Sequence, residues 1–291
     1  MSTRIVMALM LAGCHATLAD APGDGGVDAR ANPQLDAHPG TDGPVARVWG
    51  AATPILGASD PALDEDDATL SSTQTELYFA IANATKDLYV MKRATPQDPW
   101  GPKTALPFNT TTAAEETPRL SPDDLTLYFG RAGDIYVATR PSVAQPWSAA
   151  TSLASVNTTN YEKWLAVCNG NYFMISRLNG ANGQDLYQGQ LGNGAGTLVT
   201  QLSSASSEIS TFLSSDCLTV YFASNREAGN NQIFTATRTS ITAPWSTPVI
   251  VNDFGPATDN EDPWLSPASD TFVFASVRAL ATTKDLYIST R

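Results

Sequence analysis

A segment of about fifty residues recurs five times between Val48 and the C-terminus, and this repeat constrains the fold more than any other feature. Each copy has a short apolar run, a turn rich in Ser, Pro, Asp or Asn, and an aromatic run, which together predict a β-hairpin. The apolar runs are marked by Leu70, Leu120, Leu165, Leu213 and Leu265, and the copy at Leu165 is one residue shorter. A second signature, Asp-Leu/Ile-Tyr, follows at Asp87, Asp134, Asp185 and Asp285, with Gln232-Ile233-Phe234 as its variant.

A fourth element begins thirteen residues after that Asp, at Trp100, Trp147 and Trp245, with Leu198 in the third copy. Four short strands in about fifty residues match one propeller blade. The last copy ends before its tryptophan, whereas Trp49 precedes the first copy in the same sequence context. The sequence therefore predicts an all-β, five-bladed propeller of four-stranded blades over residues 47–291. Pairing the strand around Trp49 with the last blade would close the ring and remove an exposed sheet edge.

The best-preserved hairpin reads Leu120-Ser121-Pro122-Asp123 and continues to Leu127-Tyr128-Phe129. Two other copies end their aromatic run in Ala-Ser-Asn-Arg226 and Ala-Ser-Val-Arg278, ahead of the Asp-Leu-Tyr position. These motifs resemble the TolB-like, WD40-like (PD40-type) β-propeller repeat family over residues 48–291. The resemblance implies a binding scaffold. The best-known relatives have six blades rather than five, so the resemblance points to no particular partner.

The N-terminus has a different character, with Arg4, an apolar run over residues 5–11 and then Ala12-Gly13-Cys14. This pattern resembles the signal peptide of a bacterial lipoprotein, which implies cleavage after residue 13 and a lipid anchor on Cys14. Residues 14–46 are rich in Ala, Asp, Gly and Pro and predict a disordered tether. Because His15 rather than Asp follows Cys14, we expect an outer-membrane lipoprotein, on the periplasmic face or at the cell surface. No run of eighteen apolar residues predicts a membrane-spanning helix.

The net charge and the histidine content exclude several classes of function. The chain has 17 basic and 29 acidic residues, a net charge of −12, which disfavours nucleic acid as a partner. Its two histidines, His15 and His38, both lie in the predicted tether. A Ser-His-Asp or Cys-His nucleophile and a histidine zinc site are therefore excluded from the propeller. We expect a monomer without a cofactor, and we favour a protein without enzymatic activity over an enzyme.

Two acidic clusters precede the first and last hairpins, at residues 64–67 and 259–262. Neither has the alternating Asp spacing of a calcium loop, so we interpret both as solvated acidic loops. The alternative interpretation is a calcium site, for which the candidate ligands are Asp64, Asp67, Asp259 and Asp262.

Carboxylates also recur at one position of the repeat. Asp66, Glu116 and Glu261 stand four residues before the apolar Leu, and Glu162 and Glu208 are displaced by one. Folding each hairpin brings this position opposite Arg131, Arg177, Arg226 and Arg278, which predicts cross-strand ion pairs. The alternative is a carboxylate ring acting on a glycan. In the first copy Ala82 and Asn83 replace the arginine, so Asp66 is predicted to be unpaired and is the first candidate for binding or acid–base catalysis.

Further candidates stand just before the apolar Leu, where the copies differ: Thr69, Arg119, Trp164, Phe212 and Trp264. Trp164 and Trp264 either pack between blades or stack on a sugar or peptide in the channel, and Arg119 is a further ligand-binding candidate. Cys168 and Cys217 lie in neighbouring hairpin turns, either bridged or as two free thiols.

Together these patterns predict an exported, lipid-anchored scaffold that binds a protein, peptide or glycan. The alternative is a glycan-active hydrolase, which needs unpaired carboxyl groups about 5–10 Å apart near the axis. A purely structural envelope protein is a third possibility.

Overall fold

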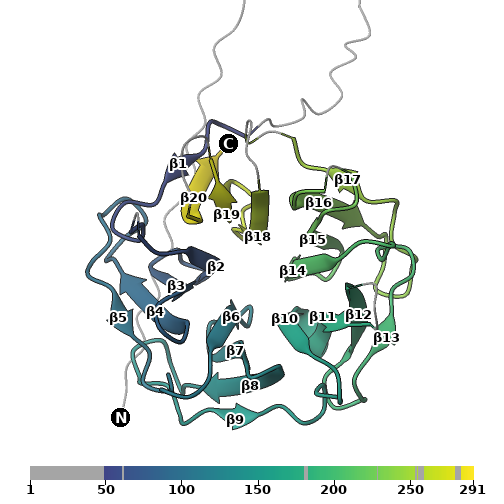
Figure 1. The fold of residues 1–291 in the computed structure, drawn as a ribbon, viewed down its shortest axis with the longest axis horizontal. Helices are drawn as coiled ribbons and strands as arrows, with labels where there is room; N and C mark the ends of the chain where they lie inside the picture. The colour runs from purple at the N-terminus through teal and green to yellow at the C-terminus, as the bar shows by residue number, and fades with distance from the viewer. Residues whose placement is uncertain are drawn as a thin grey trace, which may run out of the picture. The chain divides into compact units, whose positions relative to one another are not determined.

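The computed structural model describes residues 49–60, 62–179, 183–227, 229–252, 254, 259–278 and 283–291. These residues form five antiparallel four-stranded sheets arranged as blades around a common axis (Figure 1). The prediction of a five-bladed propeller is confirmed. The signal sequence, Cys14 and the tether of residues 14–46 lie outside the described residues.

In the first four blades, successive strands run from the axis outward. Blade one contains β2 (Glu65–Leu70), β3 (Glu76–Ile81), β4 (Asp87–Lys92) and β5 (Thr104–Ala105). Blade two contains β6 (Glu115–Leu120), β7 (Thr126–Arg131), β8 (Asp134–Thr139) and β9 (Thr151–Ser152). Blade three contains β10 (Glu162–Val167), the 3-10 turn η1 (Asn169–Asn171), β11 (Tyr172–Leu178), β12 (Gln184–Gln190) and β13 (Thr197–Leu198). Blade four contains β14 (Glu208–Leu213), β15 (Thr219–Ser224), β16 (Gln232–Thr237) and β17 (Val249–Ile250).

Blade five joins the two ends of the described chain. It contains β18 (Asp259–Leu265), β19 (Thr271–Val277) and β20 (Asp285–Thr290), and its outermost strand is β1 (Thr53–Pro54). Thr53 pairs with Ile288, which confirms the predicted closure. In the part of the chain that the structure describes, no helix is long and apolar enough to span a membrane.

The tryptophans of the repeat precede the outermost strands rather than beginning them, which corrects the sequence prediction. Trp100 lies four residues before β5, and Trp49 has the same relation to β1. In blade three Leu198 lies within β13, so Asn193 holds the tryptophan's register position.

The hydrophobic core consists of five clusters, and each contains side chains from two neighbouring blades. At the closing interface, Trp49 packs on Phe254 and Phe272, with a ring-centroid distance of 5.3 Å to Phe272. Every blade therefore depends on its neighbours to bury its two faces.

A disulfide joins Cys168 and Cys217, whose Cα atoms are 5.5 Å apart. The hairpin turns that carry them lie at the ends of β10 and β14, two inner strands, where neighbouring blades approach most closely. This resolves the alternative that the sequence left open in favour of the bridge.

We expect Trp49→Ala to lower the free energy of unfolding by about 3–5 kcal/mol, because it empties the core at the closing interface. Leu56→Ala is the matched control, because Leu56 follows β1 and is 82% exposed. Its effect should stay within about 0.5 kcal/mol. Urea unfolding of both variants tests the prediction, and equal effects would show that closure does not depend on this tryptophan.

Candidate functional site: the charged axis

Each inner strand has a β-bulge at the same place, where the register with the second strand shifts. One residue of each bulge has a φ between 50° and 59°, in the left-handed region: Asp67, Thr117, Trp164, Ser210 and Asp262. A left-handed backbone costs roughly 1–2 kcal/mol for a residue other than glycine. Five such residues around one axis therefore require compensating contacts.

The bulges correct the alignment of the third copy. Val167, not Leu165, is equivalent to Leu70, because each ends the inner strand and pairs with the second strand after the shift. The missing residue lies in the turn, which Cys168 closes by donating its N–H to the Tyr172 carbonyl. Trp164 thus shares the position of Asp67 and Asp262, whereas Trp264 shares the position of Arg119.

Asp67 and Asp262 meet at the axis and are both almost completely buried. The indole N–H of Trp164 donates to Asp67 Oδ1 at 2.7 Å and to Asp262 Oδ1 at 3.1 Å. The Asp67 N–H donates to Asp262 Oδ2, and the Thr117 N–H donates to Asp67 Oδ2. Ser210 Oγ also donates to Asp262. The two carboxylates thereby compensate the bulges of all five inner strands.

The carboxyl groups of Asp67 and Asp262 have different pKa values because they lie close together. Burial alone would raise the pKa of Asp67, but Lys86, the hydrogen bond from Asp262 and Arg119 hold that pKa well below its usual range. Burial and the charge of Asp67 raise the pKa of Asp262 to about 7. At neutral pH, Asp67 is therefore ionised and Asp262 is near its midpoint.

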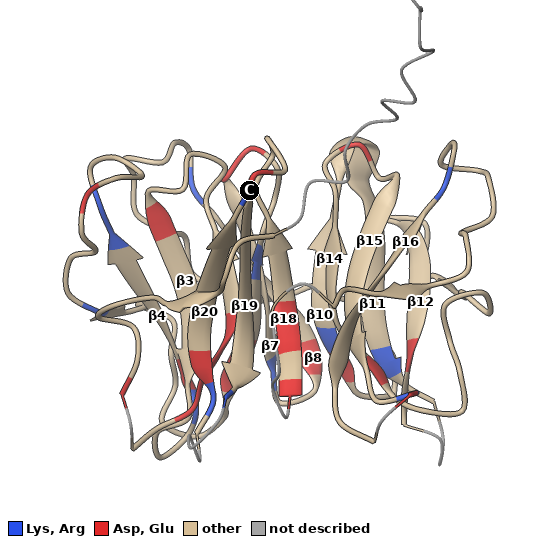
Figure 2. Ribbon diagram, turned by 90° about the horizontal axis from the view of Figure 1, so that it is seen from above, with Lys and Arg blue, Asp and Glu red and all other residues tan. Residues whose placement is uncertain are grey.

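A chain of alternating charges, here the charged ring, lies beside this pair at the ends where the inner strands begin. Its members are Glu261, Lys284, Asp66, Lys86, Glu116 and Lys163. Figure 2 shows charged residues gathered at that end of the inner strands, the lower end in the view. Blade four has Ile209 at the corresponding position and adds no charge.

Asp66 lies within the charged ring and is not the unpaired carboxylate that the sequence predicted. Lys86 Nζ lies 2.9 Å from its carboxylate and 3.0 Å from that of Asp67, and Lys284 Nζ lies 4.0 Å from Asp66. Burial raises the pKa of Asp66 above its usual value, and the charge of Asp67 adds to this. The partner, Lys86, comes from the β3–β4 turn, three residues beyond Asn83.

Of the four predicted cross-strand ion pairs, two form as predicted, one forms with a different glutamate and one does not form. Arg177 binds Glu162 and Arg226 binds Glu208, at 2.7 and 2.9 Å. Arg131 binds Glu115 at 2.8 Å rather than Glu116. Arg278 has no carboxylate partner among the described residues, because its blade has Asn260 at the equivalent position and Glu261 pairs with Lys284. In blade two the paired glutamate is therefore Glu115, one residue earlier than predicted, because Glu116 belongs to the charged ring.

Arg119 is buried and crosses the channel. Its guanidinium donates to the carbonyls of Pro118, of Ala68 in blade one and of Thr211 in blade four. The guanidinium thus contacts the backbone of the inner strands and not the protein surface. It lies between the two ends of the channel.

Beyond Arg119, a cavity of about 740 Å³, here the axial pocket, opens on the face formed by the hairpin turns. The last residues of all five inner strands line it: Leu70, Leu120, Val167, Leu213 and Leu265. Phe212, Trp264 and the hydroxyls of the hairpin turns complete the lining. Trp264 is thus buried between blades and also borders the pocket, whereas Trp164 belongs to the carboxylate pair.

The four calcium candidates do not form one cluster. Asp64 accepts the N–H of Lys284, and Asp259 accepts the N–H of Asn231, while Asp67 and Asp262 form the axial pair. Within the described residues, no group of three or more acidic, His or Cys side chains is placed to hold a metal ion.

Sequence reasoning missed the three lysines of the charged ring. A signal for two of them was present, because Lys86 and Lys284 both directly precede the Asp of Asp-Leu-Tyr. That shared position places them on either side of Asp66, in blades one and five. Lys163 aligns with Asp66 and Glu116 only when the third copy is aligned by Glu162 rather than by Leu165.

Comparison with known proteins identifies relatives by fold. No family model matches the sequence, and no curated protein matches it. An α-L-arabinofuranosidase from Podospora anserina, solved with cellotriose, is 13% identical over 84% of this chain and 96% of its own, with a TM-score of 0.57. The endo-arabinase from Bacteroides thetaiotaomicron is 12% identical over 83% and 97%, with a TM-score of 0.57. A TolB structure from Agrobacterium tumefaciens is 17% identical over 81% and 82%, with a TM-score of 0.52. At these identities the likeness shows the β-propeller fold alone.

The axial pair predicts a pH dependence of stability. Asp262 holds its proton up to about pH 7 in the folded protein but only to about its usual value of 3.8 when unfolded. The folded state binds more protons within this window, so Asp262 makes stability fall as the pH rises from about 4 to 7. Asp262→Asn should remove up to one proton from that slope, as measured by urea unfolding between pH 4 and 8. The exposed control Asp98→Asn should keep the wild-type slope, and an unchanged slope in Asp262→Asn would contradict the assignment.

Proposed function

We propose that the protein is a binding scaffold that takes its ligand in the axial pocket. One observation carries this proposal: the end of every inner strand contributes to a single cavity. A concave, largely apolar site with a few polar groups is the usual form of a ligand site. Such a pocket is absent from any one blade and arises only from the ring.

The chemistry of the axial pocket favours a protein segment or peptide with an apolar side chain. Five aliphatic side chains and the rings of Phe212 and Trp264 offer apolar contacts, while Ser215, Thr235 and other hydroxyls at the pocket offer hydrogen bonds. Asp124, Asp216 and Arg291 add charges of both signs. A glycan is the alternative ligand, held by stacking on the same rings.

A glycan-active hydrolase is the second candidate, and one observation favours it. The pKa values of Asp67 and Asp262 are driven apart, as in acid–base pairs of enzymes. Both side chains are almost wholly buried, however, and they bind the backbone of neighbouring bulges. Each carboxylate of the charged ring also has an ammonium group within 4.0 Å. We therefore favour a structural role for these acids.

The scaffold proposal includes export and a lipid anchor on Cys14, which rest on the Leu11-Ala12-Gly13-Cys14 sequence. Mass spectrometry of the mature chain should find a diacylglyceryl group on Cys14 as its first residue. Cys14→Ser should release the protein from the membrane fraction. A mature chain beginning elsewhere, or one without acyl mass, would contradict this part of the proposal and leave the axial pocket unaffected.

Blocking the axial pocket tests the binding function. Ser215 is exposed on the hairpin turn of blade four and lines the pocket, so Ser215→Trp should fill its mouth without disturbing the core. Peptides selected on the wild-type protein from a displayed library should bind this variant at least about tenfold more weakly. Ala268→Trp is the matched control, because Ala268 is exposed on the equivalent turn of blade five but does not line the pocket.

Three results would overturn the proposal. One is equal binding of ligand to Ser215→Trp and the wild type. Another is selection of no peptide, together with no binding on a glycan array. The third is turnover of arabinose-containing glycans that is lost in Asp66→Asn, which would establish the hydrolase instead.

A further inference from the structure

Four blades share an arginine that stacks on the repeat's tryptophan. The pairs are Arg93 on Trp100, Arg140 on Trp147, Arg238 on Trp245 and Arg291 on Trp49, at 4.0–4.3 Å. In each, the guanidinium Nε donates to a carbonyl of the hairpin turn in its own blade. Blade three has Leu191 and Asn193 in these positions and lacks the pair.

Two of these arginines, Arg140 and Arg238, are almost fully buried, at 4% and 8% exposure. In blade two, Arg140 Nη1 donates to the Val143 carbonyl, and Nη2 donates to Glu76 of blade one at 2.7 Å. A carboxylate from the preceding blade thus neutralises this buried guanidinium, through a charge-assisted hydrogen bond.

Arg238 repeats this arrangement without the carboxylate. Its Nη1 donates to the Ile241 carbonyl and to Gln188 Oε1 of blade three, at 2.9 and 3.2 Å. Tyr172 holds the register position of Glu76, because each faces the sixth residue of the Asp-Leu-Tyr segment, Gln190 or Lys92. Within the described residues, Arg238 Nη2 makes no hydrogen bond and no carboxylate lies within 4 Å of the guanidinium.

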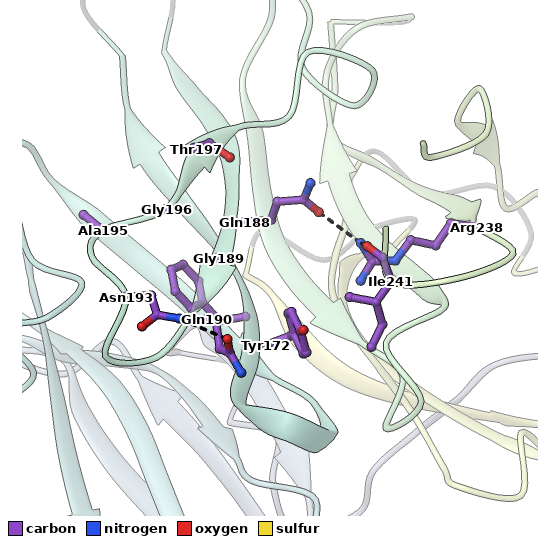
Figure 3. Close-up of a pocket in the computed structure, with 11 residues that line it drawn as sticks. Tyr172, Gln188, Gly189, Gln190, Asn193, Ala195, Gly196, Thr197, Arg238 and Ile241 are labelled. Carbon is purple, nitrogen blue, oxygen red and sulfur yellow. Dashed lines mark hydrogen bonds between the residues drawn. The ribbon is translucent and has the colours of Figure 1, made fainter. Parts of the chain in front are cut away.

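A cavity of about 470 Å³ lies beside Arg238, between blades three and four (Figure 3). Tyr172 and Ile241 give it apolar walls, and the close approach of Gly189 and Gly196 around Phe173 forms one side. Gln188 reaches toward Arg238, while Asn193 is hydrogen-bonded to Gln190 elsewhere in the cavity (Figure 3). Asn193, in the register position of the missing tryptophan, thus lines the same cavity.

We propose that this cavity, here the interblade site, binds the carboxylate of a sugar acid on Arg238. The ligand carboxylate neutralises Arg238 as Glu76 neutralises Arg140, and it accepts a hydrogen bond from Nη2. Arginine suits this role because its planar donor fork matches a carboxylate.

The remaining lining favours a hydroxylated ring over a simple acid. Side-chain amides provide both donors and acceptors, and Gln188, Gln190 and Asn193 place three of them around the cavity. Thr197 adds a hydroxyl, and the ring of Tyr172 offers an apolar face for the C–H groups of a sugar. The volume suits one or two sugar residues, so a free sugar acid and the end of an acidic glycan are the two sources of this chemistry.

The charge balance supports the same conclusion. Burial lowers the pKa of Arg238, and no carboxylate of the described residues counteracts this, whereas the hydrogen bond to Glu76 raises the pKa of Arg140. A buried cation without a counter-ion is unfavourable. A bound carboxylate would remove that penalty. The interblade site lies on the outer strands, away from the axial pocket, and its function is independent of that pocket.

Gln188→Glu tests the proposal with little change in shape. In the wild type, Gln188 accepts the Trp245 N–H at 3.0 Å, and the new carboxylate keeps this hydrogen bond. It also neutralises Arg238 without a ligand, because Gln188 already contacts Arg238. Gln184→Glu is the matched control, because it adds the same charge at the start of the same strand, outside the cavity. Binding of D-glucuronate, D-glucose and an oligoglucuronide is measured by isothermal titration calorimetry, with the thermal midpoint of each variant.

We expect D-glucuronate to bind the wild type and Gln184→Glu alike, within about twofold, and D-glucose at least about tenfold more weakly. Gln188→Glu should lose at least about tenfold in glucuronate affinity and have a higher thermal midpoint than Gln184→Glu. Tighter binding of the oligoglucuronide would indicate a glycan end, and equal binding would indicate the free sugar acid. Failure of both acids to bind, equal binding of D-glucose, or equal affinity in both variants would overturn the proposal. None of these results bears on peptide binding in the axial pocket.

Discussion

The buried carboxylate of Asp67 is the interaction on which the centre of the ring depends. Five inner strands converge on one axis, and each needs a bulge with a left-handed residue to do so. Their backbone and side-chain donors are buried and would lack an acceptor without these carboxylates. Asp67 and Asp262 supply that acceptor for donors from several blades at once. Lys86, which neutralises Asp67, also pairs with Glu116 and thereby connects the axial pair to the charged ring.

The channel has two chemically different ends because Arg119 crosses it between them. Toward the strand starts, charges alternate and are mutually neutralised. Toward the hairpin turns, the end of each inner strand is aliphatic and leaves an open pocket. One end is thus closed by ion pairs, while the other end leaves the cavity in which we propose that a ligand binds.

Differences between the copies locate function better than their common features. Arginine, tryptophan and the buried Glu recur because each blade must pack on the next. Blade three departs from the repeat with Tyr172, Leu191 and Asn193, and a cavity with an unneutralised arginine lies at its border with blade four. A departure that leaves a buried cation unpaired is not required for folding, which is why it directs attention to a ligand.

The sequence alone determined the repeat, the number of blades and the closing strand, because turn residues, alternating patterns and the displaced Trp49 are local signals. It also placed Cys168 and Cys217 in neighbouring turns, without deciding whether they bond. The bulges were hidden, since no local pattern marks a left-handed Asp, Thr or Trp, and a one-residue shift there moved the ion pair of Arg131 from Glu116 to Glu115. Three features join residues of different strands or blades. They are the pairing of Asp66 with Lys86, the contact of Asp67 with Asp262, and the cavity beside Arg238. Only the closed ring brings such groups together, because their separation along the chain says nothing about their distance around the axis.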